Sequence, residues 1–159
     1  MNANELKTTI IEPVLEKMYM SSPRATQMLL GIAAVESDMC KNLKNTICSS
    51  LGPWQIEKKT FEDIKNRYLM RDDKQQLRDD VENACGVKLE NLPFEELLTN
   101  FKLGCAFARI RLWWVSTPLP LATDVEGMAE YWKQHYNTAE GAGKEQDFFD
   151  KYNKYVIGE

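Results

Sequence analysis

The stretch SSPRATQMLLGIAAVES, residues 21–37, decides the fold because it predicts one capped helix with an apolar face. Ser22 suits the N-cap, and Pro23 suits the first helical position, where its missing N–H is not needed. Apolar residues then recur at helical spacing, at Ala25, Met28, Leu29, Ile32 and Ala33. Glu36 occupies the next position of this stripe. We therefore expect a helix over residues 22–37 that faces the core and carries Glu36 near its end.

The position of Glu36 predicts unusual chemistry. A carboxylate on the core side of a helix is costly when no Lys or Arg precedes it by three or four residues, as here. Burial should favour its neutral form and raise its pKa. A carboxyl group that stays protonated near neutral pH can act as a general acid. The alternative is a glutamate at a helix end that turns to solvent.

The rest of the chain predicts a single, mostly α domain over residues 1–159. The helix over about residues 93–115 is apolar on several faces in its second half, so we expect it to be the central buried helix, with Trp113 and Trp114 in the core. Residues 38–53 predict a long loop that could hold a small β-hairpin. Further helices are expected over about residues 4–20 with a kink at Pro13, 60–68 capped by Thr60 and Asp63, 74–85 ended by Gly86, 124–136 capped by Asp124, and 148–156.

Composition and charge exclude several classes of protein. The formal net charge is −4, and no basic stripe is available to neutralise phosphates, which argues against a nucleic-acid binder. The N-terminus lacks the apolar region of a signal peptide, so we expect synthesis in the cytoplasm. The longest apolar run contains Arg111 and is too short to span a membrane. We expect a monomer without a membrane span.

Cysteine and histidine usage narrows the chemistry further. We expect Cys40, Cys48, Cys85 and Cys105 to be reduced thiols, although a bridge between Cys40 and Cys48 stays open. A metalloprotease-type zinc site needs two or three histidine ligands, and the sequence has only His135. No phosphate-binding glycine loop is present. We therefore expect no cofactor and no metal, which leaves carboxylate chemistry at Glu36.

Three motifs occur in a characteristic order. Glu36-Ser37 closes a helix, Ser50-Leu-Gly-Pro-Trp-Gln-Ile56 is followed by Thr60, and Tyr136-Asn-Thr-Ala-Glu-Gly-Ala-Gly143 stands near the end. This order resembles the lysozyme-like superfamily, in particular the soluble lytic transglycosylases and goose-type lysozymes. The sequence of residues 131–138 is most similar to that of bacteriophage members, either endolysins or virion-associated wall hydrolases. Pro53-Trp54 departs from the usual Leu-Met, and His135 replaces a small residue.

The resemblance implies a lysozyme-like fold that cleaves the bond between N-acetylmuramic acid and N-acetylglucosamine in peptidoglycan. It implies Glu36 as the proton donor and then the base, with a lytic transglycosylase outcome favoured over hydrolysis. It places Gln55 along the sugar cleft and the hydroxyl of Tyr136 beside the catalytic carboxyl or the sugar. The implied substrate-binding residues are Ser37, Gly52, Trp54, Gln55, Tyr136 and Asn137.

For several of these residues, the residue type also allows a structural role in place of substrate binding. Trp54 could stack on a sugar or lie in the core, Gln55 could be a buried amide bonded to backbone, and Asn137 could cap its helix. Hydrolysis would need a second carboxylate, for which Asp38 and Glu57 are the open candidates. A third possibility for the protein is a catalytically silent virion or wall-binding component.

Overall fold

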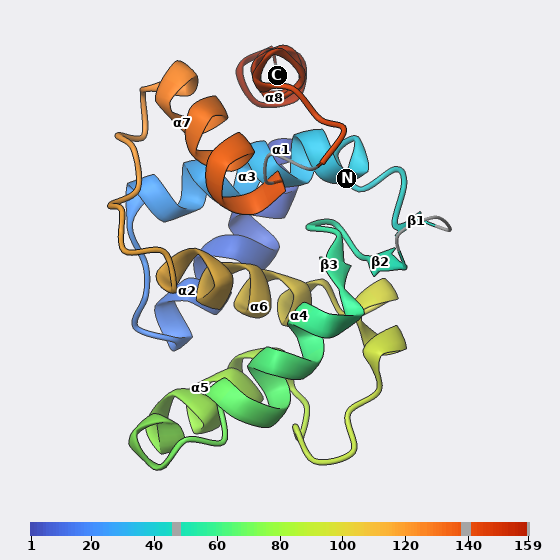
Figure 1. Ribbon diagram of the computed structural model, residues 1–159, viewed down its shortest axis with the longest axis vertical. Coiled ribbons are helices and arrows are strands. Elements are labelled where there is room, and N and C mark those ends of the chain that lie inside the picture. Colours follow the sequence, from blue (N-terminus) through green and yellow to red (C-terminus); the bar gives the residue numbers. More distant parts are fainter. Residues whose placement is uncertain (46–48, 138–140, 159) are drawn as a thin grey trace.

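The computed structural model describes residues 1–45, 49–137 and 141–158. It is mostly helical with a small antiparallel sheet, which confirms the expected fold class (Figure 1). The α-helices are α1 (Ala3–Leu6), α2 (Glu12–Lys17), α3 (Pro23–Ser37), α4 (Lys58–Asp63), α5 (Gln75–Cys85), α6 (Phe101–Trp113), α7 (Val125–Tyr131) and α8 (Glu145–Tyr152). The π-helical turns are η1 (Lys7–Ile11), η2 (Ile64–Tyr68), η5 (Trp132–Asn137) and η6 (Asn153–Ile157), and η3 (Asp72–Lys74) and η4 (Phe94–Leu98) are 3₁₀ turns.

Helix α3 forms as its sequence predicts. The hydroxyl of Ser22 accepts a hydrogen bond from the Ala25 N–H at 3.0 Å, and Pro23 occupies the first turn. The helix ends at Asp38, whose φ of 53° is left-handed and stops the α-helical hydrogen-bond pattern. Most residues between these ends are buried, so α3 fixes the position of Glu36 in its last turn.

Helix α6 is the central helix, but it is shorter than predicted. Asn100 interrupts the expected 93–115 helix, because its side chain accepts from the Leu103 N–H at 3.1 Å and so begins a new helix. Leu103 through Ile110 are all buried, and α6 contacts α2, α3 and α5 (Figure 1). The prediction that Trp113 and Trp114 lie in the core was wrong, since 58% and 42% of them are exposed where α6 reaches the surface.

Two other local predictions concern the first helix and α4. The segment in which Pro13 was expected to cause a kink or a division is divided by the π-helical turn η1, where the Glu12 N–H bonds to the Lys7 carbonyl. Pro13 follows in the first turn of α2 and offers no N–H of its own. The predicted capping box of Thr60 and Asp63 was wrong. Helix α4 already begins at Lys58, directly after a β-strand, so that Thr60 lies inside the helix.

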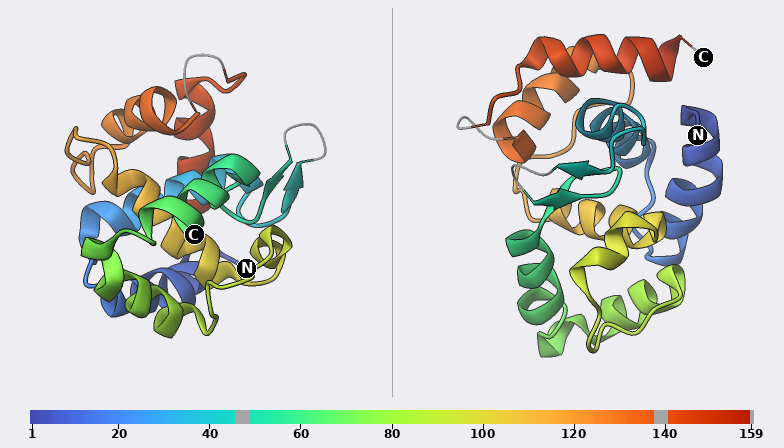
Figure 2. Two further views of the ribbon diagram at one scale, coloured as in Figure 1. Left: turned by 60° about the horizontal axis from the view of Figure 1, so that its bottom comes forward. Right: turned by 90° about the vertical axis from the view of Figure 1, so that its right-hand side faces the viewer.

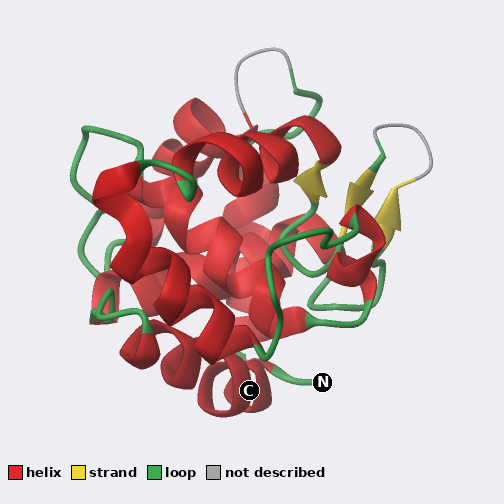
Figure 3. Cartoon of the chain, turned by 90° about the horizontal axis from the view of Figure 1, so that it is seen from below, coloured by secondary structure: helices red, strands yellow, loops and turns green. Residues whose placement is uncertain are grey.

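The sheet is built from β1 (Lys44–Asn45), β2 (Ser50–Leu51) and β3 (Ile56–Glu57), paired antiparallel in that order. The β2–β3 turn contains Gly52 with φ of 85° and Gln55 with φ of 46°, and Leu51 pairs with Ile56. The sheet lies at one side of the molecule, as two further views show (Figures 2 and 3). This places β2 and β3 close to the end of α3.

The C-terminal helix α8 packs against α3 and α7. Phe148 is fully buried and lies so close to Gly31 of α3 that an added Cβ at Gly31 would overlap its ring. The same ring lies 5.9 Å from the ring of Trp132, centroid to centroid. Helix α8 therefore holds the indole of Trp132 against α3. In the part of the chain that the structure describes, no helix combines the length and apolar character needed to cross a membrane.

Candidate active site

A pocket of about 260 Å³ lies at the end of α3, between the sheet and η5. It brings together residues from all three sequence motifs: Glu36 from the first, Gln55 from the second, and Tyr136 and Asn137 from the third. The described residues that line it are Glu36, Asn45, Ser50, Gln55, Glu57, Arg111, Tyr136, Asn137, Gly141, Ala142 and Gly143. Its described lining mixes apolar surface with charged groups, namely the carboxyl groups of Glu36 and Glu57 and the guanidinium of Arg111.

Glu36 is partly buried at the wall of this pocket. Burial raises the pKa of its carboxyl above the ordinary value, which matches the expectation from the helix stripe. The indole N–H of Trp132 donates to Oε1 of Glu36 at 3.0 Å and, together with the positive charge of Arg111, opposes this rise. The carboxylate of Glu57 adds to it. Glu36 is thus held in one orientation, with burial as the dominant influence on its proton.

Tyr136 is buried, and its hydroxyl donates to the backbone carbonyl of Trp54 at 2.5 Å. The hydroxyl therefore does not bond to the carboxyl of Glu36, which is one of the two partners that the resemblance implies, the other being the sugar. The guanidinium of Arg111 lies 3.9 Å from the centroid of the Tyr136 ring, and its Nη2 donates to the Tyr136 carbonyl at 2.6 Å. Burial raises the pKa of the phenol, so Tyr136 is neutral and acts as a bridge between η5 and the β2–β3 turn.

Two further predicted residues lie in the pocket wall, and one lies behind it. The amide nitrogen of Gln55 donates to the Gly52 carbonyl at 2.9 Å, so Gln55 is both bonded to backbone and part of the wall. The amide oxygen of Asn137 accepts from Nζ of Lys133 at 2.9 Å. Gly52 does not line the pocket; its positive φ and the 2.8 Å that would separate an added Cβ from the Leu97 carbonyl make it a turn residue.

Two predicted substrate-binding residues lie in the interior. Trp54 is 0% exposed, and its indole N–H donates to the Leu29 carbonyl at 2.9 Å, so its ring is part of the core and has no face available to a sugar. Ser37 is also 0% exposed. Its hydroxyl donates to the Ala33 carbonyl and accepts from the Cys40 N–H, both at 2.9 Å, so Ser37 terminates α3. These two assignments are corrected.

The two candidate second carboxylates lie in different places. Asp38 accepts from Lys151 at 2.5 Å and from Tyr155 at 2.7 Å, and it does not line the pocket. Those two hydrogen bonds hold the pKa of the Asp38 carboxyl below its ordinary value. Glu57 is exposed and lines the pocket with Glu36. Only Glu57 is therefore placed to take part in chemistry beside Glu36.

Arg111 and Trp132 are among the residues of the site that sequence reasoning missed. Arg111 had a signal, because a charge inside the most apolar helix needs a polar neighbour to face. It meets that need by stacking on Tyr136 and lining the pocket. Trp132 had no such signal, since its apolar spacing also fits an ordinary core residue. Its N–H finds Glu36 at a separation of 96 residues in sequence.

The thiols stand apart from this pocket. Cys40, Cys85 and Cys105 are free, and burial raises the pKa of Cys40 to about 11 and of Cys85 to about 12, so these thiols are protonated. Cys48, and with it the open Cys40–Cys48 bridge, lies outside the described residues, as do residues 138–140 of the third motif. Within the described ranges, no three His, Cys, Asp or Glu side chains gather into a group that could hold a metal ion.

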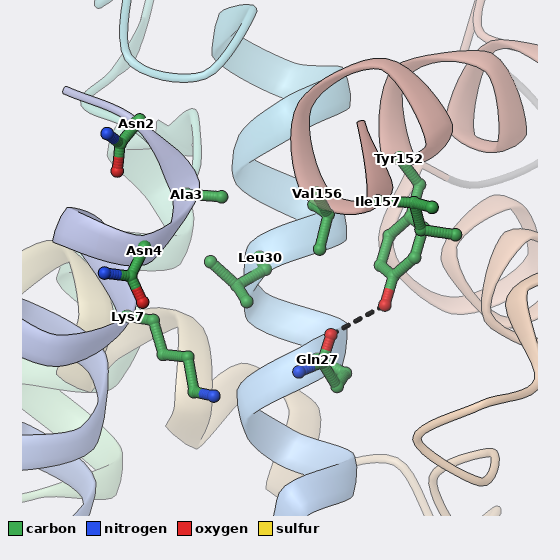
Figure 4. Close-up of a pocket in the computed structure, with 9 residues that line it drawn as sticks. All are labelled: Asn2, Ala3, Asn4, Lys7, Gln27, Leu30, Tyr152, Val156 and Ile157. Atoms are coloured by element: carbon green, nitrogen blue, oxygen red, sulfur yellow. Dashed lines mark hydrogen bonds between the residues drawn. The ribbon is translucent and has the colours of Figure 1, made fainter. Parts of the chain in front are cut away.

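A larger cavity of about 700 Å³ lies between the N-terminal turn and the C-terminal segment (Figure 4). Its polar groups include Lys7 and the hydrogen-bonded pair of Tyr152 and Gln27, whose Oη and Oε1 are 2.6 Å apart. None of the described residues that line it carries a carboxyl group. General acid chemistry therefore points to the smaller pocket at Glu36.

Comparison of the chain with protein-family models, with curated proteins and with solved structures found no match. The chemistry of the Glu36 pocket and the order of the motifs are therefore the basis for inferring a function.

Proposed function

We propose that this protein cleaves the glycan strands of bacterial peptidoglycan at the β-1,4 bond between N-acetylmuramic acid and N-acetylglucosamine. The observation that carries the proposal is Glu36, a partly buried carboxyl with a raised pKa that lines a pocket. Gln55, Tyr136 and Asn137, from the motifs that follow it in the sequence, surround the same pocket. A role in bacteriophage lysis or entry, as an endolysin or a virion component, is part of this proposal.

The proposed mechanism needs one acid that also acts as a base. Glu36 donates its proton to the glycosidic oxygen, and the bond breaks through a transition state with oxocarbenium character. The 6-hydroxyl of the same muramyl residue then attacks its anomeric carbon, and the Glu36 carboxylate takes the hydroxyl proton. The products are a 1,6-anhydro-muramyl end and a free glucosamine 4-hydroxyl, and Glu36 regains its proton. No second carboxylate is needed along this route.

Hydrolysis is a second candidate outcome because Glu57 lines the same pocket. A carboxylate there could activate a water molecule or stabilise the positive charge that develops on the sugar ring. The product would then carry a reducing muramyl end. The two outcomes differ by one water molecule in the product.

Mass analysis of muropeptides released from purified peptidoglycan tests both the activity and its type. We expect soluble fragments whose muramyl ends lack one water relative to reducing ends. Fragments with reducing ends would replace the transglycosylase outcome by hydrolysis. Tight binding to the wall without any soluble fragment would contradict cleavage and would favour a catalytically silent wall-binding protein.

The hydrogen bond from Trp132 to Glu36 predicts a pH effect. This bond stabilises the carboxylate, so Trp132→Phe should raise the pKa of Glu36 further. A general acid loses activity as the pH rises through its pKa, so the alkaline limb of the pH–rate profile should move to higher pH. Wall lysis measured across a pH series checks this. A limb that stays in place or moves to lower pH would show that the indole N–H does not control the proton.

Trp114→Phe is the matched control for this variant. Trp114 is 42% exposed, its ring packs against Tyr68, and it does not line the Glu36 pocket, so the same change of ring should leave the pH–rate profile unchanged.

The raised pKa of Glu36 also links folding to pH. Its contribution to stability is fully present below the unfolded pKa, near 4.5, and is lost as the pH rises through the folded pKa.

A further inference from the structure

Arg109 of α6 is a buried positive charge without a carboxylate partner among the described residues. The residue is only 7% exposed, and its Nε donates to the Met20 carbonyl at 3.0 Å. Within the described ranges, no Asp or Glu lies within ion-pair distance of its guanidinium. Because a buried charge is costly unless it is paired, the surroundings of Arg109 call for an explanation.

The groups that influence Arg109 most strongly do not supply the missing negative charge. They are the phenol of Tyr131 and the thiol of Cys105. Burial raises the pKa of Tyr131 above its ordinary value and raises that of Cys105 well above its own, so both groups are neutral near neutral pH. Burial also lowers the pKa of Arg109 itself. Neither group therefore neutralises the charge of the guanidinium.

Arg109 lines a pocket of about 420 Å³. The pocket is formed by the start of α3, the end of α6 and the segment that follows α6. Its two terminal nitrogens have no hydrogen-bond partner among the described residues. Every described side-chain nitrogen that is shut off from solvent does have a hydrogen-bond partner. These nitrogens are therefore accessible, and the pocket that Arg109 lines is the opening beside them.

The other residues of this pocket add to its positive character. Arg24 lines it as a second cation and is held there by a 3.0 Å hydrogen bond from its Nη1 to the Leu119 carbonyl. Ser116 and Thr117 contribute hydroxyl groups. None of the described lining residues is acidic, although the chain as a whole has a net charge of −4. The pocket is thus a local positive site on an acidic protein.

Trp113 provides a flat apolar surface beside this charge. Its side chain lines the pocket and is 58% exposed, and the guanidinium carbon of Arg109 lies 5.8 Å from its ring centroid. An exposed tryptophan next to a cation can cover the apolar face of a ligand whose negative group reaches the cation.

We propose that this pocket binds an oxyanion, a carboxylate or a phosphate, whose carrier lies on the ring of Trp113. The two free nitrogens of Arg109 present the fork that matches two oxygens of such a group, and Arg24 adds a second positive charge. The site is distinct from the Glu36 pocket, because Arg24 and Glu36 lie twelve residues apart on α3, roughly 18 Å along a helix axis. It does not depend on the proposed glycan cleavage.

The test is a titration followed through the indole N–H signals in ¹⁵N-resolved NMR spectra, at constant ionic strength. The probes are inorganic phosphate, N-acetylmuramic acid, and N-acetylglucosamine as the matched sugar without the carboxylate. We expect phosphate and N-acetylmuramic acid to shift the Trp113 signal saturably and N-acetylglucosamine to leave it in place. Arg109→Met should weaken binding by at least about tenfold, because a charge-assisted hydrogen-bonding group is lost.

Two variants keep the result interpretable. Arg78→Met removes a half-buried arginine outside this pocket, whose Nη1 donates to the Leu69 carbonyl, and should bind like the wild type. Arg24→Gln changes an exposed side chain, so it should fold normally and bind more weakly even if Arg109→Met does not fold. A response to phosphate alone supports the site and assigns it to phosphate carriers. No saturable response, binding of wild-type strength in both pocket variants, or an equal response to both sugars would overturn the proposal.

Discussion

Replacing Glu36 with glutamine should lower the release of muropeptides by at least about a hundredfold, since general acid catalysis contributes on that order or more. Glutamine keeps the size of the side chain, and its amide oxygen can still accept the Trp132 N–H that now binds Glu36 at 3.0 Å. It cannot donate a proton to the glycosidic oxygen. The loss should appear in the clearing of a cell-wall suspension, while far-UV circular dichroism stays that of the wild type.

Two carboxylate variants serve as controls for this result. Asp38→Asn should keep the activity, because Asp38 lies outside the pocket and asparagine tolerates its left-handed φ of 53°. Glu57→Gln should change the activity little along the transglycosylase route and strongly if the enzyme is a hydrolase. Full activity of the Glu36→Gln variant would refute the assignment of the acid.

Replacing Trp54 with alanine should cost about 3–5 kcal/mol of the free energy of unfolding, the range measured when large aromatic residues are removed from cores. Trp54 is 0% exposed, and Gly104 of α6 packs directly against its ring. The change would also leave the Leu29 carbonyl without the indole N–H that it now accepts. Urea denaturation followed by circular dichroism measures the loss, with the slope of the transition as a check for two-state behaviour.

Trp114→Ala is the matched control, because it removes an exposed tryptophan and not a buried one. Trp114 is 42% exposed and contacts Tyr68 at the surface, so its removal should change the stability much less. If Trp54→Ala instead folded with nearly unchanged stability and showed only weaker substrate binding, Trp54 would be a sugar platform and its place in the core would be wrong.

The parts of the structure that were predictable from the sequence depend on local interactions. Ser22 and Pro23 begin α3, Gly86 ends α5 and Asp124 caps α7, because each needs only hydrogen bonds within its own turn. The stripe on α3 also predicted the partial burial of Glu36. These features could be found because neighbouring residues alone determine them.

The features that escaped prediction depend on contacts between distant segments or on the surroundings of an element. The pairing of Trp132 with Glu36 joins residues 96 apart in sequence. The exposure of Trp113 depends on where α6 leaves the core, which periodicity cannot locate. Thr60 was misjudged because the strand β3 runs directly into α4, so that the helix began before the residue best suited to cap it.

The packing of α8 on α3 has a consequence for the order of events during synthesis. Phe148 packs against the Trp132 ring, which in turn donates to Glu36, and Lys151 and Tyr155 bind Asp38 just after α3. Helix α3 leaves the ribosome well before these contacts can form, because Lys151 follows Asp38 by 113 residues. The pocket proposed as the active site therefore stays incomplete in the nascent chain until α8 has been translated and docked.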